Sequence, residues 1–185
     1  IIWLLPFGGL FIGYLYFISD SKIAKGNNLL LEEYNKPERK IPFLMAPLVL
    51  LSTLITHLFG GSAGREGTAV QMGGAIADVC FSIFKLNHSE RRTLIILGIS
   101  AGFASVFGTP LAGALFALEI IFFSRITFRS IVLSFLVAYI AYFTVEFWEI
   151  QHTHYSIPEI PEMNFTALFW VLIVSILFGL AALLF

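Results

Sequence analysis

The stretch Gly64-Arg65-Glu66-Gly67-Thr68 places two charges inside one of the most apolar parts of the chain. Residues 44–59 before it are almost all hydrocarbon, with His57 as their only titratable side chain, and residues 69–84 after it are again largely apolar. Charged side chains at membrane depth are costly, so they usually line a polar cavity or a pathway. Glycines allow the backbone to turn tightly and to approach a ligand. The stretch therefore predicts a polar turn inside a membrane protein.

The composition favours an integral membrane protein. Of the 185 residues, 58% are hydrophobic and 12% are charged, and the mean hydropathy is +0.88. Soluble domains carry about 25% charged residues. The formal net charge of -1 gives no case for nucleic acid, and the single Cys80 cannot form an intrachain disulfide. Both ends lie in apolar segments, so we expect residues 1–185 to form one transmembrane domain that is a fragment of a longer polypeptide.

Apolar segments of two lengths follow one another along the chain. Four approach the roughly 20 residues that cross a bilayer core, namely residues 1–18, 41–59, 128–147 and 165–185. Three shorter ones, residues 68–84, 93–107 and 111–123, are separated by small-residue turns at 60–68 and 108–110. Interrupted segments of this kind mark binding sites in transporters, and their irregular backbone must face protein or water. We expect an all-α polytopic membrane protein with short, broken and re-entrant helices.

The basic residues predict which side of the membrane each loop faces. Ten of the eleven Lys and Arg residues fall within residues 22–40, 85–92 and 125–129, which the positive-inside rule assigns to the cytoplasm. The loop at residues 148–164 carries three Glu and no Lys or Arg, as expected of an outer loop. Arg65 is the exception, away from the inner face. We therefore expect Arg65 to have a specific role.

Glu66 is the first candidate for chemistry. If a helix begins here, the backbone amides of Glu66, Gly67 and Thr68 form a site that favours a small anion. The Glu66 carboxylate would occupy that site in the absence of substrate, and its protonation would release it, which links anion entry to proton uptake. The alternative is a structural ion pair between Arg65 and Glu66 at a helix junction.

Two further turns each allow two interpretations. Asn27 or Asn28 could cap a helix that begins near Leu29, or an Asn amide could donate to an anion at the inner mouth of a pathway. The turn at residues 107–110 is either a simple helix break, with Pro110 suited to a first helical turn, or a second small-residue turn packed against the first.

Glu119 is the only acid in the apolar segment 111–123. It either pairs with Arg125 or Arg129 at the membrane interface or belongs to a proton route. None of the four histidines has the spacing of a metal site. The chain has no phosphate-binding loop and no nucleophile with an adjacent base. We expect no metal, no cofactor and no enzymatic activity.

Two sequence blocks carry a family resemblance. Gly-Arg-Glu-Gly at 64–67 continues into Val-Gln-Met-Gly-Gly at 70–74, and Ala-Gly-Phe-Ala at 101–104 continues through residues 110–116 to Glu119. In order and spacing the chain resembles the CLC family of chloride channels and anion/proton antiporters. The resemblance implies inverted-repeat subunits, homodimers with one pore per subunit, and helix N-termini that converge on the anion. This chain resembles the first repeat; the second-half Gly-x-Phe-x-Pro motif and pore tyrosine are absent, so alone it should not complete a pore.

The resemblance also implies roles for single residues. The family's gating glutamate maps onto Glu66, and its inner Gly-Ser-Gly-Ile-Pro motif maps onto residues 26–30, so Asn27 replaces an anion-coordinating Ser. Thr68 stands where the family usually has Pro. Both departures resemble the fluoride/proton antiporter branch. The second, inner glutamate of many proton-coupled members falls at Ile120, with Glu119 as a substitute.

The leading hypothesis is fluoride (or chloride)/proton antiport, with Glu66 as gate and proton carrier. The expected anion-binding residues are Asn27, Gly64, Arg65, Glu66, Gly67 and Thr68. A passive chloride or fluoride channel of the same fold is the first alternative, and a membrane structural or interaction protein without transport is the second. The expected partners are the anion, protons, the lipid bilayer, a second copy of the subunit and the missing half of the repeat. The expected location is the plasma (inner) membrane of a prokaryote.

Overall fold

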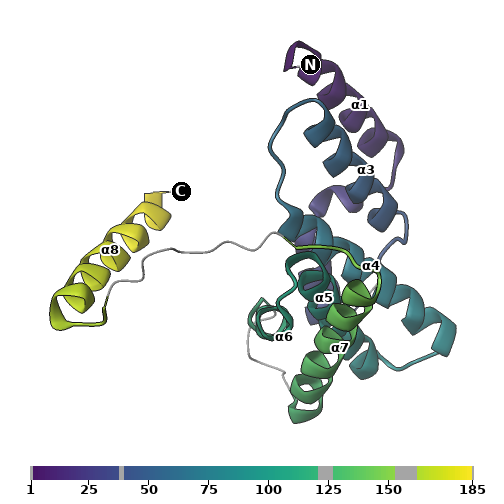
Figure 1. Ribbon diagram of the computed structural model, residues 1–185. Helices are drawn as coiled ribbons and strands as arrows, with labels where there is room; N and C mark the ends of the chain where they lie inside the picture. Colours follow the sequence, from purple (N-terminus) through teal and green to yellow (C-terminus); the bar gives the residue numbers. More distant parts are fainter. Residues whose placement is uncertain (1, 38–39, 121–126, 153–161, 185) are drawn as a thin grey trace. The chain divides into compact units, whose positions relative to one another are not determined.

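The computed structural model describes residues 2–37, 40–120, 127–152 and 162–184. In these ranges the chain forms α-helices and two short 3₁₀-helices, without a strand (Figure 1). The expected all-α class is therefore confirmed. The chain divides into two compact units, Ile1–His152 and Thr153–Phe185.

The first unit holds seven α-helices in its described ranges. They are α1 (Leu5–Ile18), α2 (Asn27–Asn35), α3 (Met45–Leu58), α4 (Arg65–Phe84), α5 (His88–Phe107), α6 (Pro110–Glu119) and α7 (Phe128–Phe147). α4 packs on α3 and α5, while α6 and α7 pack on α5 and on each other (Figure 1). α1 lies against α3. The main core joins α2, α3, α4, α5 and α6 around buried residues that include Leu30, Met45, Val70, Ile95, Ile96, Ile99 and Ala117.

The second unit contains α8 (Phe165–Leu184). This helix is apolar on every side, and none of its described residues is buried. A helix of that kind is stable only in lipid or against other protein. Together with α4 and α7, it is long and apolar enough to cross a membrane by length and composition, while α1, α3 and α6 are shorter apolar helices.

Small residues allow α4 and α5 to touch through their backbones. A Cβ added to Gly73 would collide with the carbonyl group of Gly98, and one added to Gly102 would collide with the carbonyl oxygen of Ala69. The close packing expected from the small residues of these segments is confirmed. It holds α4 directly against α5 along this face.

The break between α5 and α6 is also where the sequence predicts it. Gly108 adopts φ +66°, in the left-handed region that favours glycine, and its N–H donates to the carbonyl of Ala104 at 2.9 Å. Pro110 then occupies the first turn of α6, where its missing N–H costs nothing.

Several predicted lengths are wrong. The segment 68–84, expected to be short, belongs to a helix of 20 residues, because Arg65, Glu66 and Gly67 are already helical. The segment 41–59 yields a helix of only 14 residues that begins at Met45. α5 begins at His88 rather than Thr93, because Asn87 and Glu90 form a reciprocal capping box. α6 ends at Glu119, and residues 121–123 of the predicted segment lie outside the described residues.

Candidate functional site

The start of α4 presents backbone donors without a side-chain cap. Gly64 is the N-cap residue in an extended conformation, and no side chain accepts a hydrogen bond there. The first backbone amides of an α-helix have no partner within the helix. These amides and the positive end of the helix dipole therefore remain available to an anionic group.

The Glu66 carboxylate lies close to this helix end. Its Oε2 atom is 2.6 Å from the position that a Cβ on Gly64 would occupy, so only glycine leaves room for the carboxylate in this place. Arg65 and Glu66 are both exposed, and neither forms an ion pair with any residue in the described ranges. The Arg65–Glu66 ion pair that the sequence left open as a structural alternative is not formed.

Asn27 lies opposite the first turn of α4. Its amide nitrogen, Nδ2, is 4.0 Å from the position of a Cβ on Gly67. The capping interpretation is wrong: the N-cap of α2 is Gly26, with φ +58°, and no side chain caps this helix. The Asn27 Oδ1 atom is buried without a hydrogen-bond partner in the part of the chain that the structure describes. The starts of α2 and α4 therefore meet around the Asn27 amide.

Gln71 is a residue that the sequence analysis did not single out. Its Nε2 atom is 3.3 Å from the Cβ position of Gly26 and 3.7 Å from that of Gly67. It lies between the two helix starts, one turn after Gly67 on the same face of α4. The signal in the sequence was the spacing of four from Gly67, which places both residues on one side of a helix.

Thr68 ties α4 to the neighbouring helix. Its Oγ1 atom lies 2.7 Å from the Oγ1 atom of Thr53 on α3. The family that this chain resembles usually has proline at this position. Proline has no hydroxyl group and cannot make this contact between α3 and α4. Thr53 and Thr68 border a cavity of about 450 Å³ together with His57 and Arg65.

The turn after α5 follows Val106, which borders the same cavity as Arg65 and Thr68, so its packing against the first turn stays a prediction. Glu119 is the exposed last residue of α6, and it forms no ion pair with Arg129. Arg125, the other predicted partner, lies outside the described residues. The ring of His152 lies against Gly108, and its Nε2 atom is 2.8 Å from the carbonyl oxygen of Ser105. The proton route through Glu119 stays a prediction.

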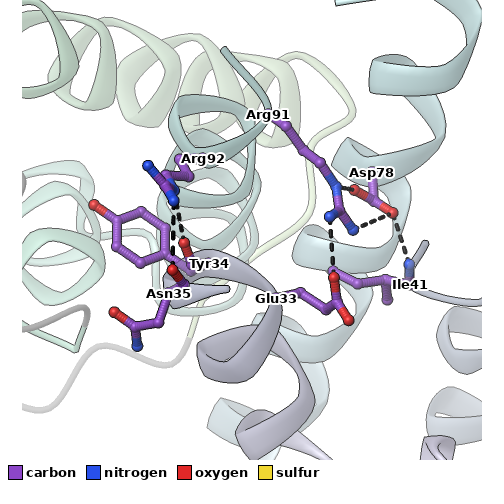
Figure 2. A network of polar contacts seen from close by, with 7 residues as sticks. All are labelled: Glu33, Tyr34, Asn35, Ile41, Asp78, Arg91 and Arg92. Carbon is purple, nitrogen blue, oxygen red and sulfur yellow. Dashed lines mark hydrogen bonds and ion pairs between the residues drawn. The ribbon is translucent and has the colours of Figure 1, made fainter. Parts of the chain in front are cut away.

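A buried charge cluster lies near the other end of α4 (Figure 2). Arg91, with 2% of its surface exposed, donates from Nε to Asp78 Oδ1 at 2.5 Å and from Nη1 to Glu33 Oε2 at 3.0 Å. The other oxygen of Asp78 accepts from the Ile41 amide at 2.7 Å. The cluster thus connects Glu33 of α2, Asp78 of α4 and Arg91 of α5 with the backbone of Ile41, which precedes α3.

The sequence analysis assigned Arg91 to a loop at the membrane surface, and this assignment is wrong. The signal that it overlooked was Asp78, an acid within the apolar segment 69–84 that needs a partner when buried. In the described ranges, no three His, Cys, Asp or Glu side chains gather in a way that could hold a metal ion.

Comparisons with known proteins agree with this architecture. A family model described as voltage gated chloride channel matches residues 8–185. A chloride/fluoride channel protein of Pseudomonas syringae pv. tomato is 44% identical over all 185 residues, which make up 41% of its length. The H(+)/Cl(-) exchange transporter ClcA of Vibrio cholerae is 31% identical over 156 residues, 76% of this chain and 32% of that protein. The chain therefore spans about two fifths or less of the length of these relatives.

Proposed function

This chain belongs to the voltage gated chloride channel family, and on that basis we propose that it is the N-terminal half of an anion transporter that exchanges fluoride for protons. Its named relatives are channels and transporters rather than enzymes. The complete activity requires the remainder of a longer polypeptide. We place the whole protein as a homodimer in the plasma (inner) membrane of a prokaryote.

One observation carries the proposal: an exposed carboxylate lies at the uncapped start of α4. When Glu66 is ionised, its carboxylate competes with a small anion for the same amide donors and for the positive end of the helix dipole. When a proton binds to that carboxylate, the charge that favours this place disappears, and the anion can take it. One residue thereby couples the arrival of a proton to the entry of an anion.

Fluoride is the preferred anion because of the donors near this helix start. The Asn27 and Gln71 side-chain amides lie beside Gly67, close to the backbone amides of the first turn. Hydrogen bonds from N–H groups to an ionised acceptor are stronger than those between neutral groups, and such donors can replace the water around a small anion. One relative is named a chloride/fluoride channel protein, which supports the same choice.

A passive chloride or fluoride channel of the same fold is the second candidate. Ile120 occupies the position of the inner glutamate that the resemblance associates with proton coupling, and one relative is named a channel. A passive pore ignores a proton gradient. The reversal potential of the full-length protein, measured with and without such a gradient, distinguishes the two candidates.

The direct test replaces Glu66 in the full-length protein. In liposomes, Glu66→Gln should abolish proton movement driven by a fluoride gradient, because the amide cannot carry the proton. Glu32→Gln is the matched control. Glu32 is an exposed acid of α2 that forms an ion pair with Lys25, and the proposed reaction does not use it. Unchanged proton flux in Glu66→Gln would overturn the proposed role of this residue.

A further inference from the structure

A second cavity, with both polar and apolar lining, lies at the opposite end of α4 from Glu66. It has a volume of about 500 Å³ and opens between the first turns of α5 and the first turn of α7. α4 has 20 residues, so its two ends are about 30 Å apart at about 1.5 Å per residue. The cavity is therefore separate from the candidate anion site.

Two arginines border this cavity. Arg92 is fixed in place by the end of α2: its Nε donates to the Tyr34 carbonyl at 2.9 Å and its Nη2 to the Asn35 carbonyl at 3.4 Å (Figure 2). Arg129 is exposed in the first turn of α7. Glu90 also borders the cavity, and its carboxylate accepts a hydrogen bond from the backbone N–H of Asn87 at 2.9 Å. With two arginines and one glutamate, the cavity lining has a net charge of +1.

Three hydroxyl groups line the same cavity. Thr127 and Ser130 of the α7 start lie 2.8 Å apart, oxygen to oxygen, and Ser130 lies 3.5 Å from the Thr93 hydroxyl on α5. All three side chains border the cavity. Arg129 presents a planar fork of donors that fits the oxygens of a phosphate, Arg92 adds its positive charge, and hydroxyls donate to the same oxygens. The polar part of the cavity therefore suits a phosphate group.

The cavity continues into an apolar groove. Leu94 and Leu97 border both the cavity and a groove of about 520 Å³ that runs between α4 and α5 as far as Val106. From Leu94 to Val106 the groove follows α5 for about 18 Å at about 1.5 Å per residue. Half of the bilayer core is about 15 Å thick. A basic head region thus leads into an apolar channel about as long as one leaflet.

The same end of the first unit carries the basic residues that the positive-inside rule assigns to the cytoplasm. The end of α2 and the starts of α5 and α7 meet there, as the Arg92 hydrogen bonds and the Thr93–Ser130 contact indicate. The cytoplasmic leaflet is rich in anionic lipid, which attracts Lys and Arg near its surface. A free phosphate would match the arginines but would leave the apolar groove without a role.

We propose that an anionic phospholipid binds in this cavity. Its phosphodiester lies between Arg92 and Arg129, near the hydroxyls of Thr127 and Ser130. One acyl chain follows the groove from Leu97 toward Val106. The lipid head region lies apart from Glu66, while the far end of the groove shares Ala69, Met72 and Val106 with the cavity that Arg65 and Thr68 border.

The test is native mass spectrometry of the full-length protein in nonionic detergent. Phosphatidylglycerol should remain bound, while phosphatidylcholine with the same acyl chains should dissociate. The double variant Arg92→Gln/Arg129→Gln should bind phosphatidylglycerol about tenfold more weakly or worse, since it lacks both charged donors. Lys36→Gln, an exposed basic residue outside the cavity lining, is the matched control and should bind as the parent does.

Two further experiments distinguish the contribution of the lipid head group from that of its acyl chain. Inorganic phosphate should not displace the bound phosphatidylglycerol. Leu97→Trp, which narrows the passage between the cavity and the groove, should weaken phosphatidylglycerol binding. If the double variant does not fold, the single variant Arg129→Gln serves, because Arg129 is exposed. Equal binding of both lipids, unchanged binding in the arginine variants, an equal loss in Lys36→Gln, or displacement by inorganic phosphate would each overturn the proposal.

Discussion

The two ends of α4 carry acidic side chains in opposite environments. Glu66, in the first turn, is exposed and has no ion pair with any residue in the described ranges. Asp78, near the other end, is 2% exposed and binds both the Arg91 guanidinium and the Ile41 amide. Burial and multiple partners hold Asp78 in one position, because leaving its charge uncompensated would be costly. Glu66 has no such constraint, and its proposed role as a gate requires that freedom.

The same contrast extends to the residues around each acid. Near Asp78, Arg91 reaches two carboxylates on different helices, so the cluster acts as a structural joint (Figure 2). At the start of α4, the Glu66 carboxylate lies by Gly64, and the uncharged amides of Asn27 and Gln71 lie beside the next residue, Gly67. These groups can exchange one anionic partner for another without leaving a charge buried. The following predictions test this division of roles, from the largest expected effect to the smallest.

Arg91→Met should cause the largest loss of stability. Removing one partner of a buried ion pair costs about 3–5 kcal/mol, because the remaining charges lose their compensation. The measurement is thermal unfolding of the purified full-length protein in detergent. Arg65→Met, at the exposed end of the same helix, should change stability by less than about 0.5 kcal/mol. Equal effects of the two variants would contradict the contrast between the two ends of α4.

Gly64→Ala should disturb the proposed gating by Glu66 more than the fold. The new Cβ would lie 2.6 Å from Glu66 Oε2, so the carboxylate must move away from the helix start. The displaced carboxylate then competes less well with the anion for the amide donors, so the coupling between fluoride and proton flux should fall roughly tenfold, which corresponds to about 1.4 kcal/mol. The measurement compares both fluxes in liposomes. Gly179→Ala is the control, since a Cβ at Gly179 on α8 meets no atom within 4 Å.

Thr68→Val should cost about 1 kcal/mol, because it removes the hydroxyl contact with Thr53 while keeping the side-chain shape. A double-mutant cycle with Thr53→Val isolates the interaction. Thr144→Val, which affects an exposed threonine of α7, provides the comparison. Additive losses at positions 53 and 68 would show that the two hydroxyls do not stabilise each other.

Glu119→Gln should have the smallest effect on stability, within about 0.5 kcal/mol, because the side chain is exposed and forms no ion pair with a described residue. Proton flux is the informative measurement for this variant. A reduced flux with normal fluoride binding supports the proton route through Glu119. Unchanged flux removes Glu119 from that route.

By itself the sequence determined the all-α membrane class, the break at Gly108 and the family resemblance. Hydropathy, glycine conformation and proline geometry act over a few neighbouring residues, so they can be interpreted without a structure. The helix lengths at α3, α4 and α5 were less predictable, because capping and buried polar contacts outweighed hydropathy there.

Only the tertiary structure decided which polar groups meet. It paired Arg91 with Asp78, 13 positions away, and with Glu33, 58 positions away, and it brought the Asn27 and Gln71 amides to Gly67. It also left Glu66 without an ion pair among the described residues, although Arg65 is its neighbour in the chain. Such pairings depend on how α2, α4 and α5 pack, and adjacent residues on a helix do not face each other.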